Sequence, residues 1–170
     1  MKKLIFTALL ISQISTAETI SKIIDGDTIK VLERQNSIRL DCIDTPESKM
    51  VGKQHAQIIN GMNIGVMATE HLESLISIGD IVEMKCKTVD KYGRSICEIF
   101  KNGVNINKKM VADGYAFIPT KYCKNPEYIT AFKIAQREKA GLHSIDGFNK
   151  QDPQKFRDCV RGDAKQDCNE

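Results

Sequence analysis

The sequence lacks a marked excess of either charge. Its 170 residues include 25 Lys and Arg against 22 Asp and Glu, which gives a formal net charge of +3. Strongly basic proteins attract nucleic acid through their overall field, and this chain has too small an excess to do so. A polyanionic ligand would therefore have to be held by individually placed residues.

Long apolar runs are also missing after the first residues. No stretch beyond residue 17 is long and apolar enough to cross a bilayer, so we expect no stable membrane insertion. Residues 1–17 combine two lysines, an apolar core and small residues, the order typical of a secretory signal peptide. A buried N-terminal helix is the alternative. We expect an exported protein, periplasmic or secreted, with a domain at 18–143 and a polar, cysteine-containing tail at 144–170.

The spacing typical of a zinc site is absent as well. No two cysteines form a C-x-x-C pair and the three histidines are scattered, which argues against zinc. An even number of cysteines in an exported chain indicates disulfides instead, and six cysteines allow fifteen pairings. The cysteines are Cys42, Cys86, Cys97, Cys123, Cys159 and Cys168.

One pairing follows from the spacing around a turn. Cys86 and Cys97 are equidistant from the centre of Asp90–Gly93, so they would face each other in a hairpin. A one-residue shift in register would instead place the two side chains on opposite faces. The other pairs are assigned as Cys159 with Cys168, which share the tail, and Cys42 with Cys123, by elimination.

Five short runs rich in β-branched and apolar residues predict strands. Turn residues separate the first three runs, and Asp90–Gly93 separates the last two, which should form a hairpin. A long polar loop at 50–65 follows the third run. The five runs are Thr19–Ile24, Thr28–Leu32, Ser37–Ile43, Ile81–Val89 and Arg94–Phe100.

Three helices complete the prediction. The first has an approximate helical stripe of apolar residues at 66–78 and would end at Gly79. Asn105 would cap the second, and Asn125 would cap the third, which has Gly141 as its C-terminal glycine. A helix inserted after the third strand is the order of an OB-type barrel, a fold that binds oligonucleotides on one face. The expected fold is α+β: a five-stranded OB-type β-barrel with three helices.

Two acidic clusters flank the second and third strands. Asp27 begins the second strand and Asp44 ends the third, so pairing around the turn at 33–36 would place Asp27 opposite residues 42–44. Two neighbouring carboxylates repel each other unless a cation joins them, and oxygen ligands suit Ca²⁺ or Mg²⁺. Taken alone, Asp25-Gly26-Asp27 fits a β-turn with Asx hydrogen bonds better than it fits a metal site.

The ordered motifs are more specific than either cluster. "IDGDTIKV", "IRLDCIDTPE" and "VDKYGR" resemble the thermonuclease, or staphylococcal nuclease-like, family over residues 18–142. The resemblance implies an OB-fold, Ca²⁺-dependent phosphodiesterase that cuts DNA and RNA with low sequence specificity and leaves 3′-phosphates. We expect it to act as a monomer.

The resemblance also implies residue roles. Asp27, Asp44 and the main-chain carbonyl of Thr45 would bind Ca²⁺, and Glu47 would act on the attacking water as a base or as its orienting group. The scissile phosphate would be held by Arg39 and Arg94, and the nucleotide by Lys91, Tyr92 and Tyr122.

The residue types fit that chemistry. Phosphodiester hydrolysis adds negative charge at phosphorus, and a guanidinium makes paired, charge-assisted bonds to its oxygens. Each arginine has a structural alternative. Arg39 would pair with Asp41 or a buried acid, and Arg94 would be a solvated strand end.

Two departures from the family pattern lie near the C-terminus. The family often ends its last helix with Gly, a hydrophobic residue and Trp, whereas this chain has Gly141-Leu142-His143 and no Trp. "DPQKFRDC" at 152–159 resembles a Pro…Phe-Arg tail of some exported members. These differences concern C-terminal packing and leave the catalytic set complete.

Two other functions compete with the nuclease. One is a non-catalytic nucleic-acid-binding OB module, which the loss of a catalytic residue would mark. The other is a disulfide-stapled exported interaction domain with a metal-stabilised loop. The complete set of matched residues favours the nuclease.

Overall fold

The first strand connects two parts of one sheet. The structure is a computed structural model that describes residues 16–49, 56–162 and 168–169. β1 (Thr16–Asp25) pairs through its first four residues with β6 (Ile81–Val89) and through the rest with β2 (Thr28–Val31). Register shifts at two points of the β1–β2 ladder bend the strand, as β-bulges do. One strand can therefore contribute to both halves of a barrel.

The expected signal peptide falls largely outside the described residues. Its first 15 positions are not described, and its last two, Thr16 and Ala17, lie in β1 opposite Met84 and Glu83. Cleavage after residue 17 would therefore shorten β1 by two paired residues.

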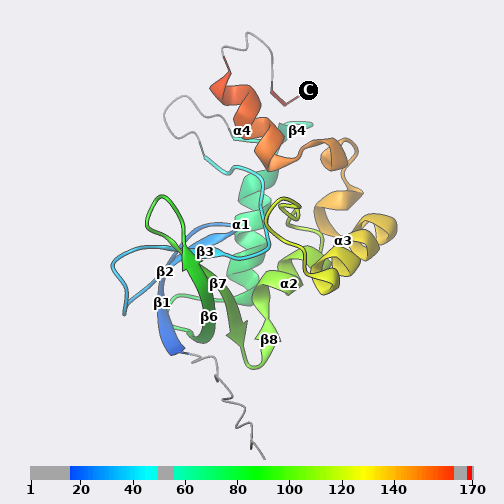
Figure 1. The fold of residues 1–170 in the computed structure, drawn as a ribbon. Helices are drawn as coiled ribbons and strands as arrows, with labels where there is room; N and C mark the ends of the chain where they lie inside the picture. The colour runs from blue at the N-terminus through cyan, green and yellow to red at the C-terminus, as the bar shows by residue number, and fades with distance from the viewer. Residues whose placement is uncertain (1–15, 50–55, 163–167, 170) are drawn as a thin grey trace, which may run out of the picture.

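A parallel pair of strands closes the barrel. β3 (Ile38–Leu40) follows β2, and β7 (Ser95–Lys101) follows β6 in an antiparallel hairpin. β3 and β7 then pair in parallel, with Arg39 opposite Ile96. The result is the closed five-stranded barrel of an α+β fold, as predicted (Figure 1). β8 (Val104–Asn105) turns back and pairs antiparallel with the end of β7.

The predicted helix starts are confirmed by their caps. The Asn105 side chain accepts a hydrogen bond from the Lys108 N–H at the start of α2 (Ile106–Ala112), and Asn125 does the same for α3 (Pro126–Glu138). The predicted end of α3 is wrong. Lys139, with φ 53°, takes the left-handed position, and its N–H bonds carbonyls of the last turn.

Gly141 serves a close approach instead of a cap. A Cβ at Gly141 would lie 2.2 Å from the Asp113 main-chain oxygen. This approach positions a 3₁₀ turn, η1 (Gly141–Ser144), in which His143 takes the place of the family's tryptophan. The buried His143 ring meets three Phe rings at their edges, and burial lowers its pKa.

α1 (Ile64–Leu75) ends earlier than its apolar stripe suggested. Ile76 is extended, with φ −137°, yet it is fully buried, whereas Ile78 is exposed. The core therefore takes the apolar residue that follows α1 from an extended segment and not from a further helical turn.

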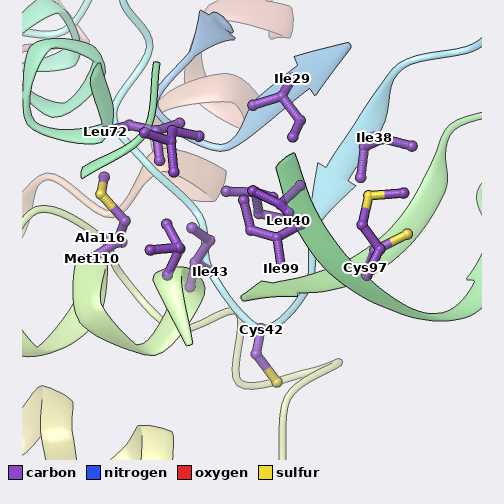
Figure 2. Packing of buried hydrophobic residues seen from close by; sticks show 14 of the residues in the cluster. Ile29, Ile38, Leu40, Cys42, Ile43, Leu72, Cys97, Ile99, Met110 and Ala116 are labelled. Carbon is purple, nitrogen blue, oxygen red and sulfur yellow. The ribbon is translucent and has the colours of Figure 1, made fainter. Parts of the chain in front are cut away.

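The barrel interior and the helices share one core (Figure 2). β2 and β3 contribute Ile29, Ile38 and Leu40, each at most 1% exposed. Leu72 of α1 and Met110 of α2 close one end of this interior. Each such side chain stabilises the fold by roughly 1.5–3 kcal/mol through burial. The opposite end of the β2–β3 pair is left for polar residues.

The segment predicted as a loop is partly structured. Residues 50–55 lie outside the described part, but Ile58–Ile59 (β4) and Met62–Asn63 (β5) form a small hairpin that leads into α1. Asn63 then caps α1 by accepting from the Val66 N–H. The hairpin places Gln57 and Gly65 beside the segment that follows β3.

The tail contains a fourth α-helix that was not predicted. A short 3₁₀ turn, η2 (Phe148–Lys150), precedes α4 (Pro153–Arg161), and Figure 1 shows α4 beside β4. Asp152 caps α4 and Phe156 is buried beneath it. No helix in the described part of the chain is long and apolar enough to span a membrane.

All three predicted disulfides are present. Cys86–Cys97 joins directly opposed residues of the β6–β7 hairpin, with Cα atoms 4.0 Å apart. The other two join Cys42 to Cys123 and Cys159 to Cys168. The first of these connects the end of β3 to the segment before α3, and the second closes the end of α4.

Removing the hairpin bridge should destabilise the barrel. We expect the double variant Cys86→Ala/Cys97→Ala to lower the free energy of unfolding by about 2–4 kcal/mol, since a bridge restricts the unfolded chain. Chemical denaturation measures this. Cys159→Ala/Cys168→Ala, which opens a loop of similar length in the tail outside the barrel, is the control; it should loosen mainly the tail and shift the barrel transition less. Non-reducing peptide mapping that joins Cys86 to any cysteine except Cys97 would contradict the assignment.

Candidate functional site

The turn between β1 and β2 holds a buried carboxylate in place. Asp27 Oδ1 accepts from the Thr28 hydroxyl at 3.0 Å, and Oδ2 accepts from the Thr45 N–H at 2.8 Å and its hydroxyl at 3.1 Å. Gly26 allows this approach, because a Cβ there would lie 2.9 Å from Thr45 Oγ1. The Asp25-Gly26-Asp27 turn therefore positions a carboxylate, besides forming the Asx turn in which Asp25 Oδ1 accepts from the Asp27 N–H.

Asp44 reaches the same place by a different route from the one predicted. The β2–β3 register places Asp27 opposite Leu40, whose N–H donates to the Asp27 carbonyl, and not opposite residues 42–44. The chain then turns at Cys42, which has φ 63° and is bonded to Cys123. A two-bond bridge to Phe117 fixes Asp44 beyond this turn.

Arg39 joins the two carboxylates. Its Nη1 forms an ion pair with Asp27 Oδ2, and its Nη2 donates to Asp44 Oδ1 at 2.7 Å. Of the two structural alternatives for Arg39, pairing with a buried acid is therefore observed, whereas pairing with Asp41 is not; Asp41 pairs with Lys87. A guanidinium thus satisfies two acids that burial alone would disfavour.

Burial and neighbouring charges shift the pKa values of the three acids in different directions. Burial acts to raise the pKa of Asp27, but the charge of Arg39 and the bond from Thr45 outweigh it and hold that pKa below its ordinary value. Burial and the charge of Asp27 raise the pKa of Asp25 to about 7. The pKa of Asp44 is also raised, chiefly by burial.

Glu47 is held by its main chain. Its N–H donates to Gln57 Oε1 at 2.9 Å, and its carbonyl accepts from the Gln57 N–H at 2.9 Å. Gly65 at the start of α1 packs against the same backbone, since a Cβ there would lie 2.3 Å from the Glu47 carbonyl carbon. The Glu47 side chain is left partly exposed, at 27%.

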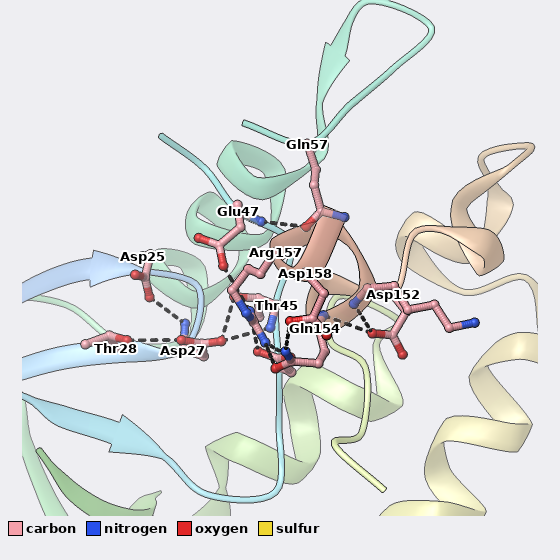
Figure 3. A network of polar contacts seen from close by, with 12 residues as sticks. Asp25, Asp27, Thr28, Thr45, Glu47, Gln57, Asp152, Gln154, Arg157 and Asp158 are labelled. Carbon is pink, nitrogen blue, oxygen red and sulfur yellow. Dashed lines mark hydrogen bonds and ion pairs between the residues drawn. The ribbon is translucent and has the colours of Figure 1, made fainter. Parts of the chain in front are cut away.

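A second arginine completes the cluster and was missed in the sequence. Arg157, on α4, donates from Nη2 to Asp44 Oδ2 at 2.6 Å and from Nη1 to Glu47 Oε1 at 2.9 Å (Figure 3). A signal for its placement was present: Asp152-Pro153 is a helix start, and the helix that it begins carries Arg157. The tail is therefore part of the site.

Arg94 lies in the same cleft but has a different partner. Its Nε donates to Asp90 Oδ2 at 2.8 Å, across the β6–β7 turn, and it is not bonded to Asp27 or Asp44. The Tyr92 ring is 65% exposed, with Arg94 Cζ 5.4 Å and Lys91 Nζ 5.0 Å from its centroid. The turn thus presents a flat aromatic surface flanked by positive charge.

Tyr122 offers a comparable surface on another wall. Its ring is 75% exposed, and Lys121 Nζ lies 5.3 Å from the ring centroid. The adjacent Cys123 is bonded to Cys42, so the Tyr122 segment is tied to the end of β3.

One cleft of about 1360 Å³ contains every residue predicted for the site. Side chains at the barrel end, the β6–β7 turn, the Tyr122 segment and α4 all line it. The structure brings Asp27, Asp44, Thr45 and Arg39 into direct contact. Glu47 joins them through Arg157, while the other predicted residues face the cleft separately.

The carboxylates fit a hard cation in part. Asp27 and Asp44 converge on one guanidinium, which shows that both can reach a single positive centre, and their oxygens are donors that Ca²⁺ prefers. No group of three or more His, Cys, Asp and Glu side chains within the described residues is arranged to bind a metal on its own. Main-chain, water or substrate oxygens would therefore have to complete the coordination.

Comparisons with known proteins point to one family. A family model described as staphylococcal nuclease homologue matches residues 37–144. An uncharacterized endonuclease of Escherichia coli O157:H7 is 29% identical over 126 residues, which cover 72% of this chain and 74% of that protein. Endonuclease YncB of Bacillus subtilis is 28% identical over 145 residues, 77% of this chain and 66% of that protein.

An uncharacterized protein of Bacillus anthracis is 36% identical over 133 residues, 73% of this chain and 59% of that protein. The chain thus spans less than two thirds of this relative's length. The matched family model covers β3, the barrel hairpin and helices α1 to α3, including most of the residues in the cleft. This chain belongs to the staphylococcal nuclease family.

Proposed function

We propose that this protein is an exported, Ca²⁺-dependent nuclease that hydrolyses phosphodiester bonds of DNA and RNA with little sequence preference. The family match and the endonuclease names of its relatives support a nuclease function. The observation that carries the proposal is the buried Asp27–Arg39–Asp44 cluster at the base of a cleft with exposed tyrosines. Three disulfides are compatible with an oxidising, exported location.

The residues divide the chemistry among them. When bound at Asp27, Asp44 and Thr45, Ca²⁺ would supply a Lewis acid that neutralises charge on the phosphate. Glu47 orients or deprotonates the attacking water from the edge of the cluster. To hold phosphate oxygens through paired donors, Arg39 would exchange Asp27 and Asp44, and Arg94 would exchange Asp90, for the substrate. The 5′-oxygen leaves, and the products carry 3′-phosphates.

Weak sequence preference follows from the kind of contacts that the cleft offers. Tyr92 and Tyr122 present exposed rings on which any base can stack, a contact worth about 1–3 kcal/mol per base. Lys91 and Lys121 lie beside these rings and would contact the sugar-phosphate backbone. The protein would act as a monomer.

Plasmid cleavage tests the proposal against its rivals. Purified protein should nick and degrade plasmid DNA in CaCl₂ and should stop when a chelator is added. Retarded DNA in a gel without cleavage would favour the non-catalytic OB module. Neither cleavage nor binding would favour the interaction domain. A product analysis by 3′-end labelling, before and after phosphatase treatment, checks the 3′-phosphate.

Loss of either cluster carboxylate should remove Ca²⁺ binding. We expect Asp27→Ala and Asp44→Ala to abolish Ca²⁺-dependent cleavage and to weaken Ca²⁺ binding, because each removes one of two convergent oxygen donors. Titration calorimetry with CaCl₂ measures the affinity, and circular dichroism checks that the barrel is folded. Asp41→Ala, which removes a neighbouring carboxylate that pairs with Lys87, is the control. Undiminished affinity in both cluster variants would refute the metal assignment.

A lysine, which keeps only the positive charge, should not replace the function of either arginine of the site. Arg39→Lys and Arg94→Lys keep a positive charge but lose the planar pair of donors. We expect turnover to fall by a factor on the order of 10²–10³, measured as kcat on a defined oligonucleotide. Arg34→Lys, at an arginine bonded to Glu18 and not part of the cleft lining, is the control. A near-normal kcat in either variant would mean that the arginine supplies only positive charge at a distance or a structural contact.

A further inference from the structure

The tail supplies an internal cation to the site. The Arg157 guanidinium reaches both oxygens of Asp44, at 3.1 Å and 2.6 Å, and one oxygen of Glu47 at 2.9 Å. These are short, charge-assisted bonds of the kind that are roughly twice as strong as neutral ones. The Arg157 side chain is only 18% exposed. Its contacts are therefore shielded from water and salt to a considerable degree.

No oxygen of Asp44 is left without a guanidinium partner. Oδ1 accepts from Arg39 at 2.7 Å as well as from Arg157, and among the described residues only Arg157 donates to Oδ2. A cation that binds Asp44 must therefore compete with at least one of these guanidinium donors for a carboxylate oxygen that accepts only a few partners. Oδ2 is the oxygen at which Arg157 is that competitor. The first ligand exchange would accordingly take place between Arg157 and the cation.

Electrostatic repulsion adds to this competition for the Asp44 oxygens. Two guanidiniums already face the carboxylates of Asp27, Asp44 and Glu47. A divalent cation would enter with Arg157 nearby, and like charges a few Å apart repel in a site of low dielectric. Arg157 thus opposes the cation both by occupying its ligand and by repelling its charge.

Several contacts hold α4 in the position from which Arg157 reaches the carboxylates. Phe156, the preceding residue, is buried. Gln57, which fixes the Glu47 main chain, also donates to the Gln151 carbonyl at 3.0 Å. The Cys159–Cys168 bridge closes the far end of the helix. The Arg157 guanidinium is therefore held close to Asp44 by the rest of the fold. Only the Arg157 side chain has to move to release Asp44.

We propose that Arg157 is a built-in competitor of the divalent cation for Asp44, so that the tail sets the Ca²⁺ concentration at which the site fills. This inference rests on the proposed Ca²⁺-dependent nuclease function and deepens it. Where Ca²⁺ is scarce, Arg157 occupies Asp44. Where Ca²⁺ is abundant, as outside the cell, Ca²⁺ replaces Arg157 at Asp44, and sites of only about 10⁻⁴–10⁻³ M affinity suffice there.

Calorimetric titration of the full-length, chelator-treated protein with CaCl₂ alone tests the competition. Arg157→Gln removes the charge and should lower the Kd for Ca²⁺ by about tenfold or more, within the range typical of coupled sites. Arg157→Lys retains a charge but cannot bridge three oxygens, so its Kd should lie between those of the wild type and Arg157→Gln. Arg161→Gln, on the same helix but paired with Asp158 and not with Asp44 or Glu47 in the described part of the chain, should match the wild type. Arg157→Lys decides the outcome if Arg157→Gln does not fold.

The result separates this inference from the proposed function. An unchanged or higher Kd in the Arg157 variants, in a protein that binds Ca²⁺ and cleaves plasmid DNA, would reject the competition and leave the nuclease standing. A wild type that neither binds Ca²⁺ nor cleaves would reject the proposed function and the competition with it. The Ca²⁺ concentration for half-maximal cleavage should fall together with the Kd if the competition operates.

Discussion

Arg39 lies between two carboxylates, Asp27 and Asp44, that burial alone would keep from ionising together. The guanidinium is part of β3, so the charge that permits this pair is supplied by the barrel itself. The arrangement depends on the β2–β3 register, which brings Asp27 beside the end of β3, and on the turn at Cys42, which returns Asp44 to the same place. The Thr45 bonds, the Gly26 contact and the Cys42–Cys123 bridge all serve to maintain that one ionic contact.

The tail is joined to the barrel at the cluster of charges. A boundary at residue 143 was the natural interpretation of the polar composition that follows it, yet Gln151 and Arg157 are bonded to Gln57 and to Asp44 and Glu47. A buried phenylalanine and a helix cap make the tail a third wall of the cleft. The functional unit therefore extends beyond the part that the family model matches.

The sequence predicted the strands, the caps at Asn105 and Asn125 and the Cys86–Cys97 bridge because each depends on a local pattern: alternation, a capping side chain, or residues equidistant from a turn. The Cys42–Cys123 bridge, which spans 81 positions, was reached only by elimination. Prediction from the sequence failed where distant residues decide the outcome. α1 ends where Ile76 enters the core from an extended segment. The left-handed conformation of Lys139 accompanies the close packing of Gly141 against Asp113. The site residues Asp27, Asp44 and Arg39 could be found from motifs. For Arg157 the sequence signals only the start of its helix, because its contact with Asp44 spans 113 positions.

The parallel β3–β7 pair that closes the barrel also fixes the distance between the main-chain positions of Arg39 and Arg94. Arg39 is opposite Ile96, so the strand that carries the first arginine and the turn that carries Arg94 are related by a ladder of main-chain hydrogen bonds. A ladder can shift only in whole residues, about 3.3 Å at a time, and an odd shift would turn Arg39 to the other face. The separation of the two guanidinium origins is therefore a discrete property of the sheet. Gradual change in the span between them has to come from side chains and from the β6–β7 turn, which makes that turn the place where substrate fit can be tuned without rebuilding the barrel.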